Sequence, residues 1–107
     1  MTASLSLSDN TISGEIPASF GELTSLKELN MENNELSGDF PSALSGMTSI
    51  KSILLAGNSL VGRVSSEVCD LRSMDLETFV TDCPGTDGPT LTGVICPTPS
   101  CCTACVE

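Results

Sequence analysis

The chain has 107 residues, of which 39% are hydrophobic, and its aromatic side chains are three Phe without Trp or Tyr. Fourteen Asp and Glu against four Lys and Arg give a formal net charge of −10, which disfavours nucleic acid and anionic membranes because their phosphates attract basic residues. The sequence contains no His, which removes the usual general base and every Ser-His or Cys-His catalytic arrangement.

The first expected element is a short strand in which Leu5 and Leu7 alternate with serines. This alternation predicts a strand with one buried face. After it, Gly14 allows a sharp bend because glycine tolerates positive φ. Pro17 suits a turn or a sheet edge because it lacks an N–H group. Apolar residues at 20, 23 and 26 have a spacing of three, which predicts a short helical or 3₁₀ segment.

The same series of residue types returns twice more along the chain at a constant spacing. The second copy places Leu29, Met31, Asn34, Leu36, Gly38, Phe40, Pro41, Leu44 and Met47 on Leu5, Leu7, Asn10, Ile12, Gly14, Ile16, Pro17, Phe20 and Leu23. The third copy continues these columns with Ile53, Leu55, Asn58, Leu60, Gly62, Val64, Val68 and Leu71. A fixed period of this size predicts a solenoid, in which each coil buries its core against its neighbours.

The repeated pattern L-x-x-L-x-L-x-x-N-x-L resembles the leucine-rich repeat, and its L-x-G-x-I-P extension is similar to the plant-type 24-residue subclass over residues 2–74. The resemblance implies an α/β solenoid with short parallel strands on the concave face and turns or short 3₁₀ or helical segments on the convex face. It also implies that Asn10, Asn34 and Asn58 form an internal ladder. Such a ladder has a physical reason, because a tight turn leaves backbone N–H and C=O groups that need partners.

The third copy departs from the pattern after Gly62, since Ser65 replaces the expected Pro. We therefore predict leucine-rich repeats in residues 1–68 and a disulfide-rich C-terminal cap in residues 69–107. Within the cap, residues 76–83 are expected to supply one last strand, with Leu76 and either Phe79 or Val80 turned inward. Residues 84–93 are rich in turn formers and predict a surface loop, and residues 94–96 predict a closing strand.

All six cysteines lie in the predicted cap, as Cys69, Cys83, Cys96, Cys101, Cys102 and Cys105. An even number in a short tail predicts three disulfides and an oxidising compartment. We expect Cys101 and Cys102 to have different partners, because a bridge between sequence neighbours is strained. A zinc site is the alternative, but two adjacent cysteines are awkward joint ligands. The tail is similar to Cys-rich caps of leucine-rich repeat proteins from diatoms and related algae.

The beginning of the chain lacks the export signal that a disulfide-rich cap leads us to expect. Residues 1–7 lack the basic leader and the apolar run of a signal peptide, and no apolar stretch approaches the ~18 residues that indicate a membrane span. Met1 also precedes the first strand directly, without a polar capping segment. These features predict a C-terminal fragment of a longer protein that is extracellular, secreted or the ectodomain of a membrane protein.

The remaining candidate for function is the concave strand face, where polar side chains alternate with the core columns. The candidate ligand-binding residues are Asp9, Glu28, Asn30, Glu32, Asn33 and Ser52. Paired carboxylates at Glu28 and Glu32 are a weak sign of catalysis, because acidic residues are scattered through the chain. We expect no enzymatic activity, cofactor or metal.

Two functional hypotheses remain from the sequence. The first is a module of an extracellular or receptor-like protein that binds a neutral or basic protein, peptide or glycan. The second is a structural capping piece of a longer array whose ligand site lies upstream. Flanking sequence before Met1 would decide most of this question, because an upstream signal peptide and further repeats would make the chain a fragment.

Overall fold

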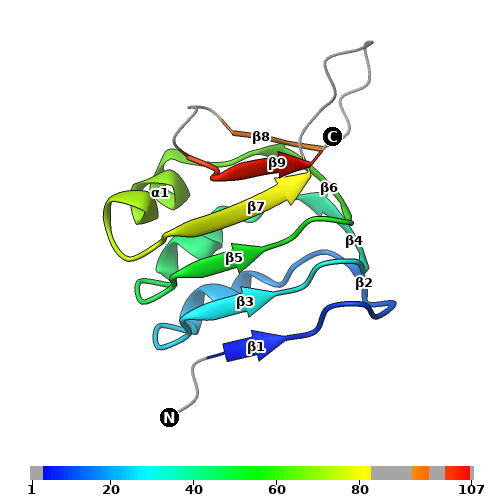
Figure 1. The fold of residues 1–107 in the computed structure, drawn as a ribbon, viewed down its shortest axis with the longest axis horizontal. Helices are drawn as coiled ribbons and strands as arrows, with labels where there is room; N and C mark the ends of the chain where they lie inside the picture. The colour runs from blue at the N-terminus through cyan, green and yellow to red at the C-terminus, as the bar shows by residue number, and fades with distance from the viewer. Residues whose placement is uncertain (1–3, 83–92, 97–100, 107) are drawn as a thin grey trace.

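The computed structural model describes residues 4–82, 93–96 and 101–106 of the chain (Figure 1). Its strands form two parallel sheets that run along the same stack of coils. The five-stranded sheet has the order β1 (Ser4–Ser6), β3 (Glu28–Asn30), β5 (Ser52–Leu54), β7 (Thr78–Asp82) and β9 (Ala104–Val106). The four-stranded sheet has the order β2 (Ser13–Gly14), β4 (Glu35–Asp39), β6 (Ser59–Arg63) and β8 (Gly93–Ile95).

The predicted α/β solenoid is confirmed, and its coils are in register. Leu5 pairs with Leu29, and Leu29 pairs with Ile53, so each of these steps equals the sequence repeat. The next step, from Ile53 to Phe79, is longer than the repeat. In the second coil, the N–H of Ile50 donates to the carbonyl of Met47. In the third coil, the N–H of Leu76 donates to the carbonyl of Leu71, so Leu71 and Leu76 are the equivalents of Met47 and Ile50. The additional residues of the longer step therefore lie between Leu71 and Leu76.

Of the four-stranded sheet, only β8 corresponds to an expected strand, the closing strand predicted over residues 94–96. The other three strands were not expected, because their glycines suggested bends. Gly14, Gly38 and Gly62 have φ of +89°, +85° and +93° within β2, β4 and β6. Ser13 pairs with Glu35 rather than with Ser37, its equivalent in the repeat, so the register of this sheet is offset from the sequence period. The backbone of these segments is thus hydrogen-bonded across coils, although its residue pattern is not that of a conventional strand.

Short helices complete each coil on the side of the core opposite β1, β3 and β5 (Figure 1). They are η1 (Ala18–Glu22), η2 (Ser42–Gly46), α1 (Ser66–Cys69) and η3 (Asp70–Ser73). Pro17 and Pro41 are the N-caps of η1 and η2. At the same place in the third coil, the Ser65 hydroxyl accepts a hydrogen bond from the N–H of Val68. The departure from Pro thus gives α1 a side-chain N-cap.

The core is a set of aliphatic columns between the strands and the short helices. Its fully buried members include Leu29, Leu36, Leu44, Met47, Ile50, Ile53, Leu55, Leu60, Val64, Val68, Leu76 and Phe79. Phe40 packs beside Phe79 with ring centroids 5.6 Å apart. The first coil is less covered, since Leu5, Leu7 and Ile12 are half-buried and Leu23 is 38% exposed. Burial is therefore greatest where a coil has neighbours on both sides.

Two disulfides fasten the part of the C-terminal region that the structure describes. Cys69 at the end of α1 is bonded to Cys101, and Cys96 after β8 is bonded to Cys102, with Cα atoms 5.0 Å and 6.0 Å apart. The adjacent cysteines thus have different partners. Cys83 lies outside the described residues, and nothing is described for the side chain of Cys105, so a third disulfide stays a prediction. Residues 84–92 of the predicted loop also lie outside, whereas Gly93 begins β8.

Candidate functional site

The five-stranded sheet turns two rows of side chains away from the core, and we call this surface the strand face. The first row consists of Ser4, Glu28, Ser52 and Thr78, which are direct neighbours on successive strands. The second row consists of Ser6, Asn30, Leu54 and Val80. Neighbouring strands in a sheet are about 4.8 Å apart, so members of a row are within reach of one ligand.

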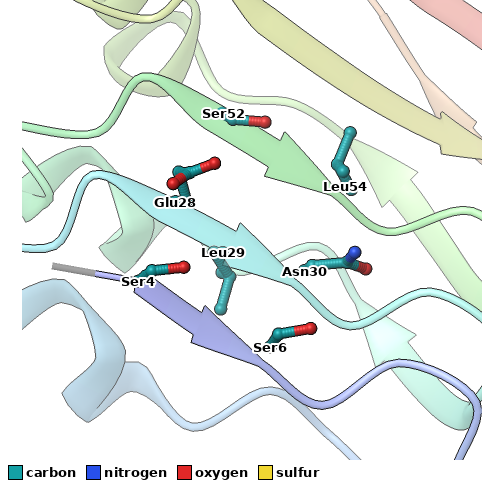
Figure 2. A pocket seen from close by; sticks show the side chains of 7 residues that line it. All are labelled: Ser4, Ser6, Glu28, Leu29, Asn30, Ser52 and Leu54. Atoms are coloured by element: carbon teal, nitrogen blue, oxygen red, sulfur yellow. The ribbon is translucent and has the colours of Figure 1, made fainter. Parts of the chain in front are cut away.

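A hollow of about 150 Å³ lies on the strand face over β1, β3 and β5. It is lined by Ser4, Ser6, Glu28, Leu29, Asn30, Ser52 and Leu54. Figure 2 shows Glu28 between the two serines of the first row, and Asn30 between Ser6 and Leu54. Three successive coils therefore contribute to one site.

The polar groups of the hollow are only partly engaged by the protein itself. The side-chain oxygen of Asn30 accepts a hydrogen bond of 3.1 Å from the N–H of Glu32, which fixes the carboxamide and leaves its NH₂ group as a donor. Glu28 is exposed. Among residues 4–82, 93–96 and 101–106, its carboxylate has no hydrogen bond or ion pair. The hollow thus presents an uncompensated negative charge beside hydroxyl and amide groups.

Half of the predicted ligand-binding residues lie in this hollow, namely Glu28, Asn30 and Ser52. The prediction omitted Ser4, Ser6 and Leu54, although their alternation with Leu5 and Ile53 places them on the same face. Leu29, a core residue with 0% exposure, forms part of the lining. Leu29 was predicted as a core residue, and without exposed surface it offers a ligand little direct contact.

Asp9 and Asn33 lie instead in the turns that follow β1 and β3. The Asn33 side-chain amide donates to the Asp9 carboxylate over 2.9 Å, and both residues have φ of +58°. Gly57 occupies the same place in the next coil with φ of +80°, and a Cβ there would overlap the side-chain oxygen of Asn33. Glu32 is half-buried and does not line the hollow. These residues shape the turns beside the site rather than the site itself.

The Asn column binds backbone groups of its own turn and, in two of its three members, of the preceding coil. The amide of Asn34 donates to the carbonyls of Met31 and Leu7, and its oxygen accepts from the N–H of Ile12. Asn58 makes the corresponding bonds to Leu55, Met31 and Leu36. Asn10 donates to Leu7 and Ser8 in its own turn.

Asp82 holds the third turn in a different way. Its two carboxylate oxygens accept hydrogen bonds from the N–H groups of Gly57 and Asn58, at 3.0 Å and 2.8 Å. In the earlier coils, the N–H groups of Asp9 and Asn33 donate to the carbonyls of Glu32 and Ala56 instead. A side-chain carboxylate therefore replaces the backbone acceptor at the last repeat. This role was not predicted, because Asp82 stands outside the repeated columns.

The described part of the chain offers neither a metal centre nor a membrane span. In residues 4–82, 93–96 and 101–106, no group of three His, Cys, Asp or Glu side chains could hold a metal ion. Cys69, Cys96, Cys101 and Cys102 are in disulfides, so their sulfurs are not thiolate ligands. Within the same ranges, no helix has the length and apolar character needed to cross a bilayer.

Comparison with known proteins agrees with this geometry. The family model described as leucine rich repeat matches residues 2–60. No curated protein gives a significant match to the chain. Among solved structures, the chain is similar to the leucine-rich repeat ectodomain of the plant membrane receptor kinase GASSHO1/SCHENGEN3 from Arabidopsis thaliana, in complex with CASPARIAN STRIP INTEGRITY FACTOR 2.

The chain matches only a small part of the length of the plant ectodomain. The TM-score is 0.64 at 29% sequence identity, and the alignment covers 73% of this chain and 9% of the ectodomain chain. The parallel strands, the period of the core columns and the family match all describe the same architecture. The chain belongs to the leucine-rich repeat family, with repeats of the plant type.

Proposed function

We propose that the chain is a non-enzymatic ligand-binding module of an extracellular or receptor-like protein, and that it binds a protein or peptide on the strand face. The observation that carries this proposal is the hollow of about 150 Å³, which three coils build together. Its Glu28 carboxylate and Asn30 NH₂ group are available to a ligand, whereas the neighbouring turn residues Asp9 and Asn33 are bonded to each other.

The surroundings of the hollow support recognition by a rigid surface. The strands below it are fixed by parallel pairing, and their core residues Leu29 and Ile53 are fully buried. A ligand therefore meets a backbone that needs little ordering, which reduces the entropic cost of binding. The related plant ectodomain was solved in complex with a factor, which is consistent with such a role for the fold.

An extracellular setting for the module is supported by the disulfides. The two bonds that link Cys69 to Cys101 and Cys96 to Cys102 persist in oxidising compartments and are rare in the cytosol. We also propose that residues 1–68 carry the recognition surface and that residues 69–107 mainly close the solenoid. The strand face nevertheless continues onto β7 through Thr78 and Val80.

Selection from a random peptide library, with the immobilised disulfide-bonded chain as bait, tests the proposal. We expect enriched peptides whose binding is lost in Ser52→Tyr, because a phenol at the first row fills the hollow. Ser59→Tyr is the matched control, since Ser59 is an exposed residue of β6 in the other sheet. Circular dichroism of both variants establishes that the fold is kept. Undiminished binding to Ser52→Tyr, or the absence of any enriched peptide, would contradict the proposal.

Structural capping is a second candidate function, and the disulfides favour it. They join α1, the end of β8 and the segment before β9, so the last coil is covered by covalently fastened chain. We expect that fusing residues 69–107 to the last coil of an uncapped leucine-rich repeat array would raise its melting temperature. The same fusion with serine in place of all six cysteines is the control. Equal melting temperatures would contradict a capping role.

A further inference from the structure

The charge of the hollow is concentrated in one place. Glu28 is its only charged lining residue, and it lies between Ser4 and Ser52 in the first row (Figure 2). Lys27 and Lys51 are the residues immediately before Glu28 and Ser52, and neither lines the hollow. Because no described residue is paired with the Glu28 carboxylate, a ligand cation there would meet a negative charge that is not yet neutralised.

The first row also supplies the hydrogen-bond acceptors that a cation needs. A lysine ammonium carries three N–H donors, and an arginine guanidinium carries five. The Glu28 carboxylate and the hydroxyls of Ser4 and Ser52 offer oxygen acceptors on three adjacent strands. Both serine hydroxyls rotate freely enough to turn their lone pairs towards the bound donor.

The second row suits the remainder of a long basic side chain. Leu54 forms an apolar wall of the hollow, and Val80 continues that wall on β7. The methylene stems of Lys and Arg pack on such apolar surface while their charged ends stay with polar groups. The NH₂ group of Asn30 lies beside this wall and is a donor for a backbone carbonyl of a peptide.

We propose that the hollow binds one basic side chain, Lys or Arg, of a peptide ligand, with its cation on the Glu28 row and its stem against Leu54. This inference rests on the proposed function and adds the chemical class of the ligand residue. The net charge of −10 favours the same class, because an acidic protein attracts cationic ligands at long range.

The first test compares peptide pools selected on three forms of the chain. The wild type and Glu35→Gln are expected to enrich a basic residue at one position, because Glu35 is exposed on β4 and outside the hollow. Glu28→Gln keeps the shape of the side chain and removes its charge, and its pool should lose that preference. Equal enrichment of basic residues on Glu28→Gln would overturn the inference.

The second test is a double-mutant cycle with one selected peptide and its analogue that has norleucine in place of the basic residue. We expect the norleucine analogue to bind about fivefold more weakly to the wild type, as for an exposed ion pair. No such difference is expected on Glu28→Gln, because the cycle isolates the pair. Raising the salt concentration should weaken the binding of the basic peptide and leave the binding of the norleucine analogue unchanged. A fivefold loss on both forms of the chain would overturn the inference.

The outcomes also separate this inference from the proposed function. If the selected peptides contain no basic residue but still lose their binding in Ser52→Tyr, the inference is overturned and the binding function stays in place. If the peptides bind Ser52→Tyr as well as the wild type, or if selection enriches no peptide, both the inference and the proposed function are overturned.

Discussion

The side-chain amide of Asn34 donates a hydrogen bond of 2.9 Å to the backbone carbonyl of Leu7, which lies 27 residues earlier in the preceding coil. The same nitrogen also binds the Met31 carbonyl of its own turn, and the side-chain oxygen accepts from Ile12. One buried carboxamide, 8% exposed, therefore satisfies backbone groups of two coils at once. Such a group stabilises the stacking of coils as well as the turn in which it lies.

Replacing Asn34 with Ala should destabilise the chain by about 1–3 kcal/mol, because buried backbone groups lose their partners. Asn10→Ala is the matched comparison, since Asn10 is exposed and bonds only within its own turn. We expect its cost to be smaller than that of Asn34→Ala. Urea unfolding of the two variants measures both values. Equal costs would show that the bonds between coils contribute no more than those within a turn.

Burial differs between coils at equivalent positions, which gives a second prediction. Leu29 is fully buried, whereas its neighbour Leu5 on β1 is half-buried. Leu29→Ala should cost about 2–5 kcal/mol, as for other buried leucines. Leu5→Ala should cost clearly less, because part of its side chain is already in contact with solvent. The same denaturant titration checks this, and a larger cost at Leu5 would contradict it.

The close packing of η1 and η2 gives a third prediction. A Cβ on Gly21 would overlap the backbone oxygen of Ala43 in the next coil. Gly21→Ala should therefore destabilise the chain by about 1–3 kcal/mol, since backbone must move to accept it. Ser19→Ala is the control, because Ser19 is exposed in the same short helix, and it should stay within about 0.5 kcal/mol. Thermal melting distinguishes the two variants. An unchanged melting temperature for Gly21→Ala would show that the coils move apart at little cost.

The two disulfides should differ in their contributions. Cys69 and Cys101 are separated by 32 residues, whereas Cys96 and Cys102 are separated by 6. By loop-closure entropy, we expect losses of about 4 and about 2 kcal/mol when each pair is replaced by serine. Unfolding without reductant measures each double variant. A larger loss from the shorter loop would mean that contacts in the native cap, rather than chain entropy, dominate.

Strands β1, β3 and β5 of the five-stranded sheet were predictable, because alternation and the constant repeat period both identify them. Strand β9 was not predicted, because Ala104–Val106 lies in the cap, outside the repeated columns. Leu5, Leu29 and Ile53 occupy one column in the sequence and pair directly in the structure. The other sheet was not predictable in the same way. Its strands contain Gly14 and Gly38 at positive φ, and in a sequence such glycines indicate a bend as readily as an irregular strand.

The candidate site was predictable in part, for a similar physical reason. Glu28, Asn30 and Ser52 follow from alternation along β3 and β5. Asp9 and Asn33 extend the same polar column, but the chain leaves the sheet at these positions and adopts left-handed backbone. The column of Asp, Asn and then Gly57 carried that signal, since these residue types tolerate positive φ best.

The bond between Cys69 and Cys101 also determines how the chain would carry a mechanical load. Tension applied through the backbone beyond Cys101 passes through the two sulfur atoms to the end of α1, and the intervening residues bear none of it. The residues enclosed by this bond are therefore shielded, and a pulling force must first peel away β1 or β9, the two edge strands of the five-stranded sheet, which lie outside the covalent loop. Reduction would remove the shield and, at about 3.4 Å per residue, add roughly 100 Å of extensible chain.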